Sequence, residues 1–434
     1  MKMNNKMNHI NRRKFLQSSA AASGAFSILK PETAFGYTAN SSVRLGIIGC
    51  GNRGTHVARS FVNNTNTRVV ALADIFEDKL ELGKETFNGL NQEKGYPLLD
   101  TAQLFLGSDA YRRLVECKDV DAILVSTPGY FHPEHLEAAI DTGKSTYCEK
   151  PAGIDVTGAQ RIRRIGKKAQ GRQSLAIGFQ IRRATPFIGM IDKIHEGAIG
   201  TVVNVQLYYM AGYYHYDWPV GVSRDEALIR TNFWQKTISG GILLDQGIHI
   251  IDICNWALKA HPKSAVGTGG RKGRSDRGDA WSHYQVLYDY PDDIHVEFHS
   301  TQFGTGLGDV CERFFGTKGI AEAHYTGGVF IKGENPWDSG VVQGSRDTVS
   351  AEEWAAGAFK SSLDDADPNK QKAFINSIIS GKYINEAESG AVSTLSAILG
   401  RMAAERGEKV TWNEMLASNE HIDPRLDLSQ FDRR

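Results

Sequence analysis

The sequence has no surplus of either charge. Fifty lysine and arginine residues balance fifty aspartate and glutamate residues over 434 positions. A chain without net charge has no general electrostatic attraction to nucleic acid or to an anionic membrane, so we expect a small-molecule ligand. Cysteine is scarce as well, because the five cysteines are widely spaced and form no CxxC pair. This spacing argues against a disulfide framework and a structural zinc site, and we predict no metal.

Long apolar runs are also missing. The run at 18–29, SSAAASGAFSIL, spans about 12 residues, whereas a membrane span needs about 20, so no span is expected. The run follows NRRKFLQ, in which Arg12 and Arg13 precede Phe15. This order resembles a twin-arginine export signal, and the alternative is a disordered basic tail. We therefore predict that residues 1–39 are a signal peptide and linker, and that the protein is exported to the periplasm.

Short apolar runs alternate with helical patterns between residues 40 and 172. This repetition of strand, helix and strand predicts a doubly wound parallel sheet, the Rossmann type of α/β fold. The predicted strands lie at 43–48, 69–74, 120–126 and 145–148, and the predicted helices at 135–143 and 156–170.

The pattern changes after residue 173. Longer segments with alternating polarity, such as 201–210, 282–290 and 294–301, replace the short apolar runs. They predict a second, α+β domain over 173–385 with a mostly antiparallel, open sheet. A long helical pattern within 386–434 is expected to pack back on the first domain, ahead of a short tail.

A glycine-rich loop follows the first predicted strand. Gly49, Gly51 and Gly54 form a GxGxxG pattern, and Asp74 ends the next strand. Such a loop lets the backbone approach a pyrophosphate at the N-terminus of a helix, and the acid binds the ribose. An acid at position 74 favours NAD over NADP because it repels a 2′-phosphate. Asn52 and Arg53 complete the predicted cofactor loop, and Arg53 slightly weakens the preference for NAD.

Polar residues follow two further strands. Ligands of such sheets lie beyond the carboxyl ends of the strands, so Ser126, Thr127 and Pro128 are expected beside the cofactor. The pair Glu149–Lys150 ends the next strand and is predicted to contact the cofactor as well. His132 is also predicted there, although a structural role for this histidine is an equal alternative.

These features together resemble the glucose–fructose oxidoreductase/inositol dehydrogenase (Gfo/Idh/MocA) family. The resemblance rests on GIIGCGNRG (46–54), Asp74, STPGYFHPEH (126–135), GKSTYCEKP (143–151) and GGILLDQGIHIID (240–252). It implies that Lys150 is the catalytic residue that positions the substrate, and it assigns Asp245 and His249 to the active site. The segment GFQIRR implies Gln180 and Arg182 at the edge of the substrate pocket. It also implies a homo-oligomer, a dimer or tetramer, formed through the second domain.

The chemistry of these residues supports the same assignment. Asp245 and His249 are four apart on a helical pattern and are expected on one face. Oxidation of an alcohol needs a base for the hydroxyl proton, which suits His249 with Asp245 as its partner. Lys150 can stabilise the developing alkoxide charge. Tyr213 lies in the aromatic segment 208–219 and is predicted to bind a sugar ring, with core packing or a subunit interface as an equal alternative.

Three functions remain open at this stage. The first is an NAD(P)-dependent oxidoreductase acting on a hydroxyl of a sugar, glycoside or cyclitol. The second is a redox-neutral glycosidase or lyase that retains and recycles NAD. The third is a non-catalytic sensor of sugars or dinucleotides on the same fold. Export favours a tightly bound cofactor, because little free NAD is present outside the cytoplasm. The lysine after Glu149 favours the oxidoreductase.

Overall fold

We analysed a computed structural model of the chain. The structure describes residues 42–214, 217–304, 308–341 and 362–432. The predicted export signal therefore lies outside the described residues. Within them, no helix is both long and apolar enough to cross a membrane.

The first domain is built on a six-stranded sheet in which every neighbouring pair is parallel. The strand order is β3-β2-β1-β4-β5-β6, so the winding direction reverses between β1 and β4. That switch point is where open α/β sheets bind ligands. The strands are β1 (Val43–Ile48), β2 (Thr67–Asp74), β3 (Leu104–Leu106), β4 (Ala122–Val125), β5 (Ser145–Cys148) and β6 (Leu175–Ile177).

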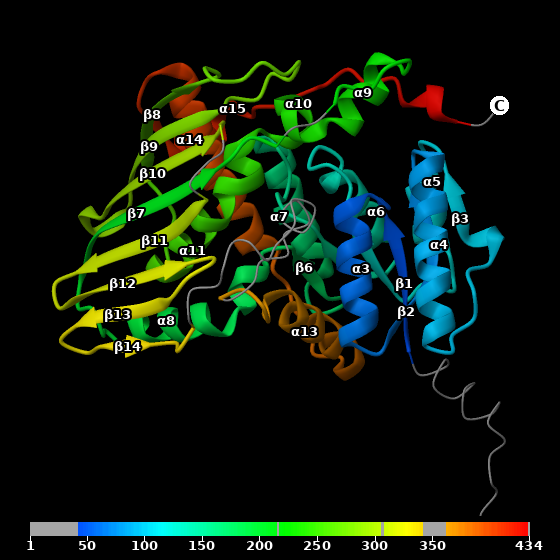
Figure 1. Cartoon of the computed structure of the whole chain (residues 1–434), viewed down its shortest axis with the longest axis horizontal. Coiled ribbons are helices and arrows are strands. Elements are labelled where there is room, and N and C mark those ends of the chain that lie inside the picture. The colour runs from blue at the N-terminus through cyan, green and yellow to red at the C-terminus, as the bar shows by residue number, and fades with distance from the viewer. Residues whose placement is uncertain (1–41, 215–216, 305–307, 342–361, 433–434) are drawn as a thin grey trace, which may run out of the picture. The chain divides into compact units, whose positions relative to one another are not determined.

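Helices cover both faces of this sheet (Figure 1). One face packs on α3, α4 and α13, and the other packs on α5, α6 and α7. Each helix buries an apolar stripe; in α3 the stripe includes Val57, Phe61 and Val62. The bounds are α3 (Asn52–Asn64), α4 (Glu77–Glu93), α5 (Ala110–Glu116), α6 (His132–Asp141), α7 (Val156–Ala169) and α13 (Ala366–Ser380).

The second domain contains a nine-stranded sheet of order β14-β13-β12-β11-β7-β10-β9-β8-β15. Its neighbours are antiparallel except for the pair β7 and β10, which is parallel. Its strands are β7 (Val202–Ala211), β8 (Ser264–Gly270), β9 (His283–Asp289), β10 (His295–Gln302), β11 (Asp309–Gly316), β12 (Gly319–His324), β13 (Val329–Gly333), β14 (Trp337–Asp338) and β15 (Val410–Thr411).

The strands of this sheet alternate between buried and more exposed side chains. In β11, for example, Val310, Glu312 and Phe314 are buried against helices. Helices α8, α11 and α14 pack on that face, as Figure 1 shows at the left. The helices of this half are α8 (Thr185–His195), α9 (Arg224–Arg230), α10 (Lys236–Ser239), α11 (Ile248–Leu258), α14 (Ala387–Arg406) and α15 (Trp412–Ser418).

The structure confirms the predicted fold class, a parallel Rossmann sheet with a mostly antiparallel second sheet. Helix α14 packs on α7 of the first domain and also on β8 and β9 of the second. The predicted boundary at residue 172 precedes β6, which pairs with β5 and belongs to the first sheet. The run at 174–179 has the short, apolar character of the other runs in the first domain, and it supplies the last strand of that sheet.

Candidate functional site

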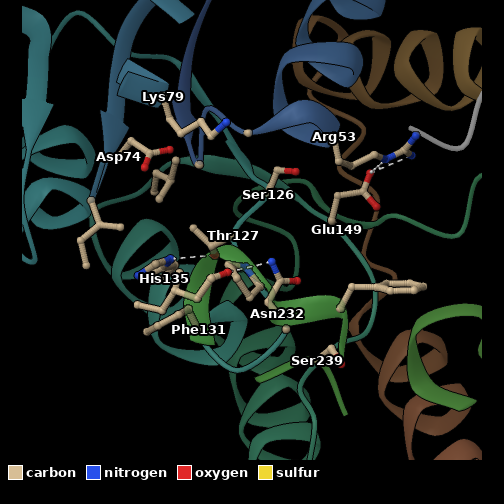
Figure 2. A pocket seen from close by; sticks show the side chains of 18 of the residues that line it. Arg53, Asp74, Lys79, Ser126, Thr127, Phe131, His135, Glu149, Asn232 and Ser239 are labelled. Atoms are coloured by element: carbon tan, nitrogen blue, oxygen red, sulfur yellow. Dashed lines mark hydrogen bonds and ion pairs between the residues drawn. The ribbon is translucent and has the colours of Figure 1, made fainter. Parts of the chain in front are cut away.

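A cavity of about 920 Å³ lies beyond the carboxyl ends of the Rossmann strands. Its lining comes from both domains, with Gly49 and Asp74 on one side and Trp234 and Asp245 on the other. Figure 2 shows Asp74 at one end of the view and the Arg53–Glu149 pair at the other. The predicted residues Ser126, Thr127 and Pro128 all line it, as do Asn52 and Gln180.

The glycine loop has the geometry of a dinucleotide cradle. Gly49 has a φ of +94°, which favours glycine, and a Cβ on Gly54 would overlap the carbonyl oxygen of Gly49. Gly51, by contrast, lines the cavity and a Cβ there would meet no atom within 4 Å. Helix α3 begins at Asn52, so its unpaired N–H groups open towards the space above Gly51.

Asp74 closes this loop from the end of β2. Its carboxylate accepts hydrogen bonds from the backbone N–H of Cys50 (2.7 Å) and of Phe76 (2.9 Å). Burial raises the pKa of Asp74, and these two hydrogen bonds counteract the rise. The acid is therefore held at a fixed place in the cavity wall. Lys79, the first cation of α4, lines the same end of the cavity.

Glu149 is turned towards the cofactor loop. One of its carboxylate oxygens accepts hydrogen bonds from Arg53 Nη2 (3.0 Å) and Nε (3.1 Å). Arg53 also pairs with Asp367 of α13 at 3.4 Å. Burial of the guanidinium lowers the pKa of Arg53. The charges of Glu149 and Asp367 outweigh this effect and raise that pKa well above its usual value. This network fixes the start of α3 to the end of β5.

Lys150 is turned the other way, towards the second domain. Its ammonium group pairs with the Asp245 carboxylate at 3.3 Å and also donates to the Asp245 backbone carbonyl. The lysine side chain is 14% exposed and lines the cavity. A partly desolvated cation in this position can hold a substrate oxygen.

Asp245 lies in an unexpected π-helical turn, Leu243–Gly247, just before α11. The wider turn alters the regular four-residue alignment that we predicted, and π-turns often occur at functional sites. Within the described residues, no hydrogen bond joins Asp245 to His249, although both line the cavity. The structure therefore lacks the predicted pairing of Asp245 with His249 among its described hydrogen bonds, and the Asp245 carboxylate pairs with Lys150 instead.

His249 is buried on the cavity wall beside Phe179. Burial lowers its pKa well below the usual 6.5, and the nearby charges of Lys150 and Arg53 add to this effect. Its Nδ1 atom has no hydrogen-bond partner in the described part of the chain. The lowered pKa favours the neutral imidazole, which is the form a general base requires.

Four predicted site residues do not line the cavity, namely Gly54, which packs against the Gly49 carbonyl, and His132, Arg182 and Tyr213. His132 is buried. Its ring nitrogens lie within hydrogen-bond distance of the backbone carbonyls of Pro151 (2.7 Å) and Thr127 (2.6 Å), so its side chain supports the loop and does not face the cavity. The Arg182 guanidinium makes a two-point ion pair with Asp252 (2.7 and 2.8 Å). Tyr213 stacks on Trp234 at 5.2 Å between ring centroids.

Four aromatic residues in the described part of the second domain line the cavity, and the sequence singled out the segment of only two of them. Tyr209 comes from β7, Tyr214 follows that strand, and Phe233 and Trp234 belong to the 3₁₀ turn Asn232–Trp234. Burial, with a smaller contribution from Asp245, raises the pKa of Tyr214 to about 12. Tyr209 and Tyr214 lie in the predicted aromatic segment 208–219, whereas 229–234 carried no recognisable motif.

The cavity also has residues from distant parts of the chain. Phe131 and His135 of the β4–α6 region form a stacked pair, and Thr127 bonds His135 at 3.1 Å (Figure 2). Burial lowers the pKa of His135 to about 3. Arg230 of α9 and Leu428 near the C-terminus complete the Asp74 end. No local sequence signal connects these positions.

The residues present fit a nicotinamide dinucleotide. The space above Gly51, the α3 N-terminus and the Asp74 carboxylate match a pyrophosphate followed by a ribose. The same cavity continues to Lys150 and His249. A dinucleotide site and a set of acid–base groups therefore share one space.

Family comparisons agree with this geometry. Residues 43–177 match the family described as "Oxidoreductase family, NAD-binding Rossmann fold", and residues 189–322 match the "GFO/IDH/MocA C-terminal domain". The two stretches together cover most of the described chain.

Curated relatives match over part of their length. The chain is 26% identical over 242 residues to an inositol 2-dehydrogenase of Rhizobium meliloti (strain 1021), covering 55% of this chain and 62% of that protein. It is 29% identical over 204 residues to a glycosyl hydrolase family 109 protein of Stenotrophomonas maltophilia (strain K279a), covering 47% of this chain and 42% of that protein. The matched part is thus less than two thirds of either relative.

Solved structures share the fold over nearly their full length. A scyllo-inositol dehydrogenase from Lactobacillus casei, with bound NAD(H) and scyllo-inositol, has a TM-score of 0.64 at 19% identity. The similarity covers 86% of this chain and all of that one. An aldose–aldose oxidoreductase from Caulobacter crescentus has a TM-score of 0.65 at 19% identity, covering 85% and 99%. The chain belongs to the Gfo/Idh/MocA oxidoreductase family.

Proposed function

We propose that this protein is an NAD-dependent oxidoreductase acting on a hydroxyl of a sugar, glycoside or cyclitol. The observation that carries the proposal is the shared cavity. It contains the cradle of Gly49, Gly51 and Asp74 together with Lys150, Asp245 and His249.

The roles of the side chains follow from their positions. Oxidation of CH–OH to a carbonyl releases one hydride and one proton. A bound nicotinamide supplies the hydride acceptor. Neutral His249 accepts the hydroxyl proton, and Lys150 stabilises the negative charge that develops on the oxygen. Asp245 holds the Lys150 ammonium in place through the 3.3 Å contact.

The wall opposite the cofactor cradle supports a polyhydroxylated ring as substrate. Tyr209, Tyr214, Phe233 and Trp234 offer aromatic faces and two hydroxyl groups. Such faces stack on the C–H surfaces of a sugar or cyclitol. The relatives named inositol 2-dehydrogenase, and the neighbour with bound scyllo-inositol, favour a cyclitol among these classes.

We also propose that the cofactor is NAD and that it stays bound. The carboxylate of Asp74 disfavours the 2′-phosphate of NADP. Lys79 and Arg230 are cations at the same end of the cavity and attract such a phosphate, so the affinities for NAD and NADP should be measured side by side. Retention follows from the proposed export through the NRRKFLQ signal, since a periplasmic enzyme has little free NAD to exchange. Cell fractionation, with Arg12 and Arg13 both replaced by Lys as the comparison, tests the export.

Replacing Lys150 by Met tests the proposed function. We expect hydride transfer to fall by about 10²–10³-fold, because an electrostatic contact to the reacting oxygen is lost. Nucleotide binding should persist, since Lys150 is separate from the glycine loop. The matched control is Lys84→Met, because Lys84 pairs with Glu81 on α4 and does not line the cavity. Unchanged transfer in Lys150→Met would contradict the assigned role.

A redox-neutral glycosidase is the second candidate, because two relatives are named glycosyl hydrolase family 109 proteins. In such a reaction the hydroxyl is oxidised, a bond is broken and the carbonyl is reduced again. Release of an aglycone from a chromogenic glycoside, without net NADH formation, would favour this candidate. Neither hydride transfer nor aglycone release would favour a non-catalytic sensor.

A homo-oligomer is proposed through the second sheet. Its strands expose apolar side chains, including Leu287 (58% exposed) and Val266 (40% exposed). Both residues alternate with buried neighbours and therefore lie on the face opposite the helices. Light scattering on the purified protein would distinguish a dimer or tetramer from a monomer.

A further inference from the structure

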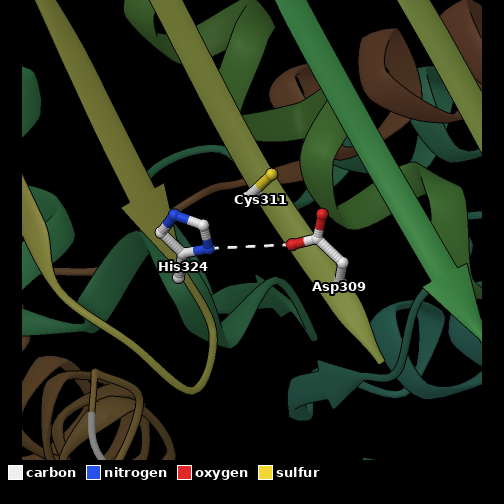
Figure 3. Close-up of side chains that lie close together, drawn as sticks. All are labelled: Asp309, Cys311 and His324. Carbon is white, nitrogen blue, oxygen red and sulfur yellow. Dashed lines mark ion pairs between the residues drawn. The ribbon is translucent and has the colours of Figure 1, made fainter. Parts of the chain in front are cut away.

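A second group of reactive side chains lies outside the cavity, on the large sheet. Asp309 and Cys311 come from β11, and His324 comes from the neighbouring strand β12 (Figure 3). One potential ligand atom from each residue lies within 4.8 Å of the other two. None of the three residues lines the cavity.

Strand pairing explains why these residues meet. Cys311 and His324 are directly opposite each other in the antiparallel register of β11 and β12. Asp309 is two residues before Cys311, so it points to the same side of the sheet. The intervening Val310 points to the helical face. The backbone therefore fixes the three side chains on one small area.

The separation between Asp309 and His324 suits two ligands of one metal ion better than a hydrogen bond. Asp309 Oδ1 and His324 Nδ1 are 3.7 Å apart, which is longer than a hydrogen bond. Zinc bonds of about 2.0–2.3 Å in a tetrahedron place neighbouring ligand atoms about 3.3–3.8 Å apart. Carboxylate, thiolate and imidazole are the three ligand types that Zn²⁺ accepts.

The surroundings of His324 add an independent observation. Its other ring nitrogen, Nε2, contacts Glu322 Oε1 at 2.5 Å, and Glu322 also accepts a hydrogen bond from Arg313 Nε at 2.8 Å. A histidine that binds metal usually gives its second N–H to a carboxylate, which orients the ring. Glu322 and Arg313 thus leave Nδ1 directed towards Asp309 and Cys311.

We propose that Asp309, Cys311 and His324 form a binding site for one zinc-type divalent ion. Cys311 binds as the thiolate after loss of its proton, His324 binds through Nδ1, and Asp309 binds through one oxygen. Water takes the fourth position, because the Asp309 side chain is 41% exposed. Glu322 is a positioning residue that acts through His324. The proposal is independent of the proposed oxidoreductase activity.

Cobalt(II) provides the direct test. The purified protein is treated with a chelator under reducing conditions and titrated with Co²⁺, which replaces zinc and reports thiolate ligation by an absorption band. We expect one equivalent to produce the thiolate-to-cobalt band and the strong visible bands of a tetrahedral site, and zinc to displace them. Absence of the thiolate band in the wild-type protein would overturn the proposal without any variant.

Variants identify the ligands. Cys311→Ser should abolish the thiolate band, whereas Cys117→Ser, which changes a partly exposed cysteine of the first domain, should retain it. Glu322→Gln should weaken zinc binding by about 10- to 100-fold while preserving one site. Circular dichroism and bound-nucleotide content verify that each variant is folded. A thiolate band that persists in folded Cys311→Ser would also overturn the assignment.

Discussion

Two adjacent residues at the end of β5 have separate tasks. Glu149 is 4% exposed and faces Arg53 at the cofactor loop, whereas Lys150 faces Asp245 in the second domain. A charged pair in sequence usually lies on a solvated surface. Here the end of a buried parallel strand turns one charge towards each domain. The pair thereby connects the glycine loop with Asp245 in the wall of the second domain.

At the residue scale, His249→Gln should reduce the rate of hydride transfer by about 10²–10⁴-fold, the usual contribution of a general base. A base must be deprotonated, and the pKa of His249 is lowered well below 6.5. We therefore expect kcat/KM of the wild-type protein to remain level as the pH falls through 6.5 and to decline only below it. His195→Gln, at a partly exposed histidine outside the cavity, is the control.

Either of two results would contradict the proposed role of His249. A wild-type decline centred near pH 6.5 or above would mean that an unperturbed group is titrating, and full activity of His249→Gln would remove the residue from the proton-transfer step.

At the element scale, the turn between β1 and α3 carries two glycines with different tasks. Gly54 allows the helix to contact the Gly49 carbonyl, so packing within the fold itself requires glycine at position 54. Gly51 has open space where its Cβ would be, so we expect that a bound ligand, and not the fold, requires glycine at position 51. The fold alone does not require glycine at position 51, where φ is −69°.

This difference predicts opposite outcomes for two similar variants. Gly51→Ala should unfold at nearly the same urea concentration as the wild type but bind NAD at least about tenfold more weakly, a loss of roughly 1.4 kcal/mol. Gly54→Ala should lower the free energy of unfolding by about 1–3 kcal/mol, because a methyl group is forced against the backbone. Urea titration and calorimetric titration with NAD measure the two quantities. Normal NAD affinity in Gly51→Ala would place the pyrophosphate elsewhere.

The sequence predicted the elements with strong local patterns. The first two glycines of the GxGxxG loop, Asp74 and the strand ends at Ser126 and Lys150 line the cavity, because each marks the carboxyl end of a parallel strand. His132, Arg182 and Tyr213 share their segments with lining residues, but satisfied contacts with Pro151, Asp252 and Trp234 hold them behind the wall. Position along a strand or loop is readable from sequence, whereas side-chain pairing is not.

Contacts between distant segments were not predictable for the same reason. The π-helical turn at 243–247 has no distinctive composition, so the pairing of Asp245 with Lys150 could not be anticipated. Likewise, Asp309 and Cys311 are separated from His324 by a strand reversal, which conceals the proposed metal site from any search for short spacings. Antiparallel register alone brings these three residues together.

At the scale of the whole molecule, the two domains supply different halves of the reaction site. The Rossmann domain provides the cofactor cradle and Lys150, and the second domain provides Asp245, His249 and the aromatic wall. Neither half contains all the groups that the proposed oxidation requires. The central claim is therefore that one cavity holds a resident NAD next to a hydroxyl-oxidising centre.

The most direct test is the redox state of the nucleotide that the purified protein carries. The protein is mixed with a panel of cyclitols and sugars, without added cofactor, and then denatured, and the released nucleotide is identified by mass spectrometry. We predict close to one nucleotide per chain, released as NAD⁺ before mixing and as NADH after mixing with a substrate from the panel. Protein that releases no nucleotide, yet binds and exchanges added NAD, would contradict the resident cofactor. Bound NAD⁺ that no member of the panel reduces would contradict the hydroxyl-oxidising centre.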